Sequence, residues 1–271
     1  MHGIGNDFVM VDAIQHPLSE GILKDLAVKT NDRKFGIGGD GLILLERGNE
    51  APFRMRMFNP DGSESEMCGN GIRCFAKLAR EHGHTTDPEI AVETGAGTLM
   101  LKLENDGQVR VDMGIARLKR GEIGMTGNSD EEYVEQPLAA SVPGLKGTAV
   151  SMGNPHLVIF VDDVKAVELD NIGPELERYA DFPKRTNVHF IQVVDRNTLI
   201  QRTWERGAGA TLACGTGACA SAVAAYKTGL AEAKMEVRLP GGNLQIEITP
   251  GYRVFMTGPA EVVFEGEFPL D

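Results

Sequence analysis

The sequence predicts an α+β fold, a mixture of helix and sheet in two pseudo-symmetric half-domains, each a mostly antiparallel sheet wrapped around a central helix. Three observations lead to this prediction. Short alternating apolar runs occur along most of the 271 residues, two segments that follow glycine-rich loops have helical character, and the chain contains an internal repeat of about 146 residues. A repeat of that length is far too long for a solenoid and indicates a duplicated half-domain.

The repeat is clearest around two cysteines. The stretch "RMFNPDGSESEMCGNGIRC" from Arg56 aligns without gaps with "RTWERGAGATLACGTGACA" from Arg202. Cys68 and Cys214 therefore lie at equivalent positions, each twelve residues after the arginine. We expect one half-domain over residues 1–115 plus 260–271, a second over 116–259, and an active site in the cleft between them.

Short strands precede each cysteine. Their apolar residues alternate or form short runs bounded by turn residues, as in half-buried and buried strands. The predicted strands are Val9–Val11, Ile43–Leu45, Met55–Phe58, Leu157–Val161, Phe190–Val194 and Leu199–Thr203.

One helix is expected after each cysteine loop. Residues Gly71–His82 carry apolar side chains at i, i+3, i+4 and i+7, and the glycine that follows is a natural stop. Residues Gly217–Thr228 are apolar on nearly every side, which is typical of a buried helix. We therefore interpret both segments as the central helices of their half-domains.

Composition excludes several classes of protein. The net charge of −12 and the pI near 5.0 argue against nucleic acid and anionic membranes as partners, because those surfaces require clustered Lys and Arg. No apolar segment approaches the roughly 20 residues of a membrane span, and the start of the chain has no signal-peptide pattern. We expect a cytoplasmic protein that binds a small molecule and holds its four cysteines as thiols. The oligomeric state is left open, with a homodimer as one candidate.

Cys68 and Cys214 each lie at the expected N-terminal edge of a buried helix. Backbone N–H groups and the positive end of the helix dipole stabilise negative charge there, which favours a thiolate. The glycines that follow let a carboxylate approach the backbone donors. If the two helix ends face one another, the two thiols flank one carbon, and one removes a proton while the other returns one. The pattern therefore favours a cofactor-independent racemase or epimerase.

Other interpretations of the cysteine loops are weaker. Cys74 and Cys219 lie inside the helices and are expected to serve packing. A zinc site built from all four cysteines lacks the usual C-x2-C spacing, so no metal is expected. The loops also lack the lysine of a phosphate-binding P-loop and the spacing of a dinucleotide fingerprint.

Six motifs, in order along nearly the whole chain, resemble the diaminopimelate epimerase family: "MHGIGNDF", "FNPDGSESEMCGNGIRC", "GNPH", "RTNV", "ERGAG" and "ACGTGAC". The resemblance implies interconversion of L,L- and meso-diaminopimelate, which supplies lysine and peptidoglycan synthesis, without pyridoxal phosphate or metal. It makes Cys68 the acid and Cys214 the base for the L,L isomer, with the roles exchanged in reverse. It also places His156 and Glu205 as accessory polar groups near the reacting amine and thiols.

The same resemblance implies a set of substrate-binding residues. A diamino dicarboxylic acid needs carboxylate donors and ammonium acceptors at both ends, and these side chains and loop amides supply them. The expected positions are Asn6, Asn59, Gly69, Asn70, Asn154, Asn187, Glu205, Arg206, Gly215 and Thr216.

The chain departs from the family pattern at two places. Met1 is already the methionine of the first motif, whereas many members begin a few residues earlier, so the first strand is shortened or the native start lies upstream. Gly41 stands where some members place a glutamine that reaches the substrate, and it can offer only backbone groups.

Two alternative functions stay open at this stage. A related proline or hydroxyproline racemase would share the two cysteines, but its smaller substrate would leave Arg206 and Asn187 without a purpose. A non-catalytic protein on the same scaffold would be expected to have lost a loop cysteine, and both are present.

Overall fold

The computed structural model describes residues 1–269 as two compact units. The first unit consists of Met1–Asp112 together with the segment that begins at Thr257, and the second is Met113–Met256. Residues 270 and 271, which the first half-domain was expected to include, lie outside the described residues.

The first unit is built on a mixed sheet in which β8, β7, β5, β4 and β3 lie in this order, with β6 beside β5 and β9 beside β8. Only the β3–β4 and β5–β7 pairs are parallel. The strands are β3 Val9–Asp12, β4 Leu42–Arg47, β5 Phe53–Phe58, β6 Glu64–Ser65, β7 Glu89–Thr94, β8 Gly97–Leu103 and β9 Val109–Ile115, and a separate ribbon pairs β1 His2–Gly3 with β2 Asn6–Asp7.

The second unit repeats this arrangement. Its sheet runs β10, β11, β12, β13, β14, β16, β17 and β18, with β15 beside β14, and the β12–β13 and β14–β16 pairs are again parallel. The strands are β10 Gln136–Pro137, β11 Lys146–Ser151, β12 Pro155–Phe160, β13 Asn187–Asp195, β14 Thr198–Glu205, β15 Gly209–Thr211, β16 Lys234–Leu239, β17 Gly242–Thr249 and β18 Arg253–Gly258. The order β3-β4-β5-β7-β8 therefore corresponds to β12-β13-β14-β16-β17, as expected for a duplicated half-domain.

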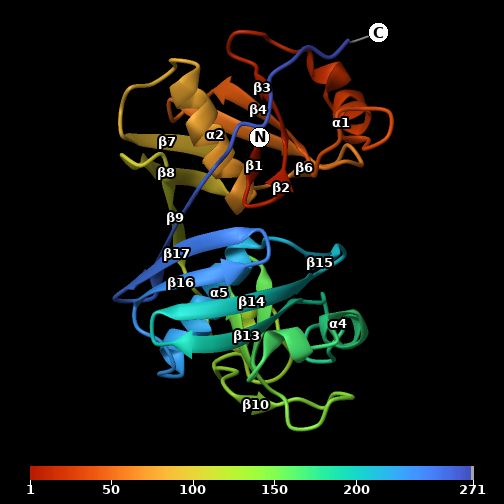
Figure 1. Ribbon diagram of the computed structural model, residues 1–271, viewed down its shortest axis with the longest axis vertical. Coiled ribbons are helices and arrows are strands. Elements are labelled where there is room, and N and C mark those ends of the chain that lie inside the picture. The colour runs from red at the N-terminus through yellow and green to blue at the C-terminus, as the bar shows by residue number, and fades with distance from the viewer. Residues whose placement is uncertain (270–271) are drawn as a thin grey trace. The chain divides into compact units, whose positions relative to one another are not determined.

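Each sheet holds one long helix against it, as predicted. Helix α2, Gly69–Glu81, packs on β4 and β8, and helix α5, Gly215–Lys227, packs on strands β11 to β14, β16 and β17 (Figure 1). All residues of α5 from Gly217 to Ala225 are buried, which explains a sequence that is apolar all round. Both helices begin two residues earlier than predicted, at the first glycine after the cysteine, because these glycines adopt helical backbone conformations rather than forming a loop.

The prediction of only two helices is wrong. Helix α1, Leu23–Asn31, packs through Leu23, Leu26 and Ala27 on the face of the first sheet that carries Leu42 and Leu44. Ile43 instead points to α2, where its Cδ1 lies 2.5 Å from the place of a Cβ on Gly71. Because helices cover both faces, β4 is an apolar run rather than an alternating strand.

Helix α4, Leu169–Glu177, covers the outer face of the second sheet in the same way. Its sequence contains Gly173 and Pro174, two residues that normally argue against a helix. Gly173 is required by packing, since a Cβ there would lie 2.6 Å from the indole of Trp204. This tertiary contact has no signature in the local sequence.

The shorter helices among residues 1–269 are η1 Glu20–Ile22, α3 Arg120–Ile123 and η2 Val164–Ala166. The predicted strands all occur, with extensions at their ends and β12 displaced toward its N-terminal side. Among residues 1–269, no helix combines the length and the apolar character that a membrane span would need.

Candidate active site

Cys68 is the residue immediately before α2. Its backbone is extended, with φ −137° and ψ 121°, and its carbonyl accepts the first helical hydrogen bond from the Ile72 N–H at 2.9 Å. The thiol therefore lies at the helix N-terminus, beside backbone N–H groups that have no hydrogen-bond acceptor within the helix. This position stabilises an anion at or next to the sulfur.

Polar side chains of the first unit surround this thiol. Cys68 Sγ lies 3.7 Å from Asn6 Oδ1, which also accepts from Asn70 Nδ2 at 3.1 Å. Asn6 Nδ2 donates to Asp40 Oδ2 at 2.6 Å. The structure therefore brings three predicted site residues together, and Asp40 fixes the amide orientation of Asn6 so that its carbonyl oxygen faces the thiol.

Arg73 is a member of this group that the sequence did not suggest. Its side chain is fully buried, and it donates to the Gly69 carbonyl and Asn70 Oδ1, both at 3.0 Å, and to the Pro259 carbonyl at 3.1 Å. It also explains Gly3, where a Cβ would lie 2.9 Å from the guanidinium. Arg73 therefore fixes the first turn of α2.

Asn59 and Gly41 behave differently from the residues around Cys68. Asn59 lies in a tight turn after β5 and its Nδ2 donates to Ser63 Oγ at 2.9 Å. The Gly41 carbonyl accepts from Val9 N–H at 2.9 Å, and a Cβ on Gly41 would lie 2.9 Å from Met57 Cε. Gly41 thus offers neither a side chain nor an unpaired carbonyl to a substrate.

Cys214 holds the equivalent position before α5, with φ −128° and ψ 101°. Its sulfur lies 3.8 Å from Thr216 Oγ1, and Glu205 is close enough to interact with the thiol. Thr211 Oγ1 donates to Glu205 Oε1 at 2.6 Å and holds that carboxylate in place. Thr216 and Glu205, both predicted from the motifs, therefore flank the second cysteine.

The expectation that a helix N-terminus would favour the thiolate is wrong for Cys214 in this state. Burial, and next the negative charge of Glu205, raise the pKa of the thiol well above its ordinary value, while hydrogen bonds from Gly217 N–H and Thr216 lower it only in part. Cys214 is therefore a thiol beside an acidic neighbour in this structure.

His156 is fully buried in β12 and belongs to a chain of hydrogen bonds. Gln201 Nε2 donates toward Thr203 Oγ1 at 2.9 Å and His189 Nδ1 at 3.3 Å, so His189 carries its proton on Nε2. That proton is donated to His156 Nδ1 at 2.9 Å, and His156 Nε2–H donates to Asn154 Oδ1 at 2.9 Å. His156 thus orients the Asn154 amide. Burial first, and then electrostatic interactions with the His189 ring and the Arg206 guanidinium, lower the pKa of His156 well below its usual value.

Asn187 connects two further predicted residues. Its Nδ2 donates to the Pro155 carbonyl and its Oδ1 accepts from Arg206 N–H, both at 3.0 Å. Arg206 is exposed, and its Nη1 donates to the Lys184 carbonyl at 3.2 Å. The "RTNV" and "ERGAG" motifs therefore meet at one place in the second unit.

Because His189 is buried in its neutral state, the free energy of unfolding should depend on pH. Burial lowers its pKa to about 3, so the unfolded chain binds more protons between about pH 6.5 and about pH 3, and stability is lost as the pH falls through that window. By linkage, one such histidine costs about 2 kcal/mol at pH 5. Urea unfolding of wild type and His189→Gln at about pH 7 and pH 5 should show a loss on acidification that is smaller by about this amount in the variant. An exposed-histidine control, His16→Gln, should match wild type, and equal losses in wild type and His189→Gln would contradict the assignment.

Comparison with known proteins points to one family. The sequence model described as diaminopimelate epimerase matches residues 1–119 and 148–263. The chain is 51% identical over 276 aligned positions to the diaminopimelate epimerase of Moorella thermoacetica, with 100% of this chain and 98% of that protein covered.

Solved structures share the fold at much lower identity. A phenazine biosynthesis protein of the PhzF family from Bacillus anthracis is similar with a TM-score of 0.69 at 17% identity, over 96% of this chain and 92% of that one. A hydroxyproline epimerase from Agrobacterium vitis is similar with a TM-score of 0.62 at 14% identity, over 95% and 86% of the two chains. At these low identities, the two similarities show a shared fold and nothing about the reaction.

Proposed function

Since the chain belongs to the diaminopimelate epimerase family, we propose that it interconverts L,L- and meso-diaminopimelate with the thiols of Cys68 and Cys214 as the two acid–base groups. This reaction would supply lysine and peptidoglycan precursors. The observation that carries the assignment of the thiols is their duplicated position, each directly before the first turn of a buried helix that starts with glycine.

The reaction is a proton exchange at one α-carbon. In the L,L direction, the Cys214 thiolate removes the α-proton and the Cys68 thiol donates its own proton to the opposite face. The carbanion between these steps carries its charge on the reacting carboxylate, and the backbone amides of Gly69, Asn70, Gly215 and Thr216 are our proposed donors to it. In the meso direction the two thiols exchange roles. Neither step needs pyridoxal phosphate or a metal.

Glu205 gives Cys214 a route to the thiolate. In the absence of substrate, the carboxylate opposes ionisation of the thiol. The α-ammonium group of a bound substrate brings positive charge to this pair, which lowers the pKa of the thiol and lets its proton pass to Glu205. We therefore assign Glu205 as the acceptor of the Cys214 proton and as a partner of the substrate ammonium group.

The distal end of the substrate would be held by the remaining motif residues. Arg206 presents a guanidinium that can bind a carboxylate through two parallel hydrogen bonds, and Asn187 fixes its backbone. We assign Asn154, oriented by His156, as an amide donor, and Asn6 and Asn59 as the polar groups contributed by the first unit. A monocarboxylate such as proline would leave Arg206 without a partner.

The same chemistry bears on the compartment. Both catalytic cysteines must stay reduced, and the structure holds all four cysteines as thiols rather than in disulfides. Thiols persist in the reducing cytoplasm, so we place the reaction there.

Proton NMR of L,L-diaminopimelate with the reduced protein in deuterated water, without added cofactor, tests the proposal. We expect loss of the α-hydrogen signal together with appearance of the meso isomer. No change with this substrate, combined with turnover of proline or hydroxyproline, would instead assign the chain to the racemase alternative. No reaction with any of these substrates would leave only the scaffold function.

A further inference from the structure

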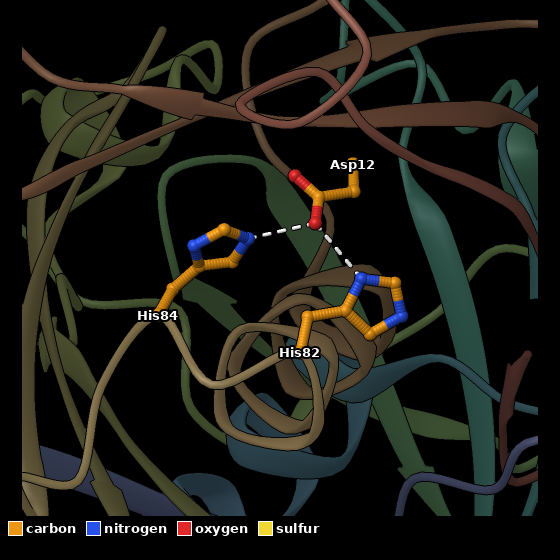
Figure 2. A group of neighbouring side chains, drawn as sticks. All are labelled: Asp12, His82 and His84. Atoms are coloured by element: carbon orange, nitrogen blue, oxygen red, sulfur yellow. Dashed lines mark hydrogen bonds and ion pairs between the residues drawn. The ribbon is translucent and has the colours of Figure 1, made fainter.

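We propose that Asp12, His82 and His84 form a binding site for one divalent transition-metal ion, with Zn²⁺ as the best match. The three side chains come together at the C-terminal end of α2 in the first unit, where Asp12 lies between the two imidazole rings (Figure 2). Their candidate ligand atoms all lie within 4.8 Å of one another.

The ring nitrogens of both histidines lie close to the same carboxylate oxygen of Asp12. Asp12 Oδ2 is 2.8 Å from His82 Nδ1 and 2.7 Å from His84 Nε2. Tetrahedral ligands at about 2.1 Å from zinc stand roughly 3.4 Å apart, so each ring would move outward by roughly 0.6 Å to admit the ion. Imidazole and carboxylate are both ordinary zinc ligands, and three of them leave a fourth position for water.

The backbone fixes all three residues before any ion binds. Asp12 Oδ1 accepts from the N–H groups of Ile14 and Gln15, both at 3.1 Å, so that Oδ2 alone faces the histidines. His82 N–H donates to the Leu78 carbonyl at 2.9 Å and His84 N–H to the Ala79 carbonyl at 3.0 Å, which closes the end of the helix. Outer hydrogen bonds that orient ligands in this way are a regular feature of metal sites.

Burial and charge suit a cation. The Asp12 side chain is 3% exposed and that of His84 8%. A carboxylate is ordinarily ionised at neutral pH, so Asp12 supplies the negative charge that a cation needs. The His82 side chain is 30% exposed, which gives water and an ion access from that side.

Binding requires only a change of tautomer. In the hydrogen-bonded cluster, His82 Nδ1–H and His84 Nε2–H each donate a hydrogen bond to Asp12 Oδ2. With zinc bound, His82 would carry its proton on Nε2 and His84 on Nδ1, and the freed lone pairs would bind the ion. No other reactant is needed. The ion would join the end of β3 to the end of α2, about 20 Å from Cys68 at the other end of that helix, and so act on stability rather than on the reaction.

The test must separate this cluster from the reactive thiols, which also bind zinc. We would therefore use full-length Cys68→Ala/Cys214→Ala protein as the background and titrate it with Zn²⁺ by calorimetry. One ion per chain is expected, and Tm should rise by about 5 °C or more when free zinc is 100 times Kd. His84→Gln and His82→Gln should each weaken binding at least about 100-fold, because even outer-shell changes cost 10–100-fold. His16→Gln, an exposed histidine nearby, should bind as the background does.

Cobalt provides an independent readout of the ligands. Co²⁺ in the background protein should show ligand-field bands without the near-ultraviolet charge-transfer absorption of thiolate ligands, and His82→Gln should abolish these bands. A background protein that takes up no zinc would overturn the proposal. So would zinc binding that is undiminished in both histidine variants, since the cluster would then be a hydrogen-bonded group only.

Discussion

Replacement of Cys68 or Cys214 by alanine should lower kcat/KM for epimerisation by about 10³-fold in both directions, because each direction needs one thiol as base and the other as acid. The fold should survive, since neither side chain caps its helix by a hydrogen bond. Circular dichroism and Tm close to those of wild type would confirm that chemistry, not folding, is lost.

Isotope exchange distinguishes the two cysteines. In deuterated water, Cys68→Ala retains the Cys214 base and should still exchange the α-hydrogen of the L,L isomer without inverting it. Cys214→Ala should do the same for the meso isomer. The reversed pattern would exchange our two assignments, and a variant that still inverts at a near-normal rate would refute the two-base mechanism.

The other two cysteines are matched controls. Cys74 and Cys219 are fully buried in the same two helices, and burial raises the pKa of Cys74 to about 12. Their alanine variants should keep kcat/KM within a few-fold of wild type. A large loss in either would mean that removing any thiol from these helices disturbs the site.

Sequence patterns predicted those parts of the structure that depend on local periodicity and on the repeat. The strands, the two central helices and the placement of both cysteines at helix N-termini follow from spacing alone. Helices α1 and α4 were missed for different reasons. Helix α1 spans only nine residues, and α4 contains Gly173 and Pro174, of which Gly173 is explained by its packing against Trp204.

The site was predicted less completely, because several of its groups meet across long stretches of chain. Arg73 resembles a surface cation in "GNGIRC", yet it binds a carbonyl 186 residues away. His189 resembles an ordinary strand residue until β12 and β13 are paired. A local pattern shows that a residue is polar, but it does not show that the residue is buried with a hydrogen-bond partner from a distant part of the chain.

Gly217→Ala is the second variant for which we expect a large effect. Alanine normally stabilises a helix by about 1 kcal/mol relative to glycine. Here a Cβ would lie 2.3 Å from Cε1 of His189, a ring that is fully buried and hydrogen-bonded through both nitrogens. The ring cannot move aside without breaking these bonds, so we expect a loss of about 2–3 kcal/mol in the free energy of unfolding, measured with urea.

The same change should lower activity, because Gly217 N–H is the backbone group that hydrogen-bonds the Cys214 sulfur. A displacement of this turn by about 1 Å would reduce kcat by about 10²-fold. Gly21→Ala, where nothing lies within 4 Å of the new Cβ, is the control and should be neutral or slightly stabilising. In a His189→Ala background the steric conflict disappears, so Gly217→Ala should cost far less there than in wild type. If Gly217→Ala lowered the free energy of unfolding equally in the two backgrounds, the contact with His189 would not be the reason for glycine at this position.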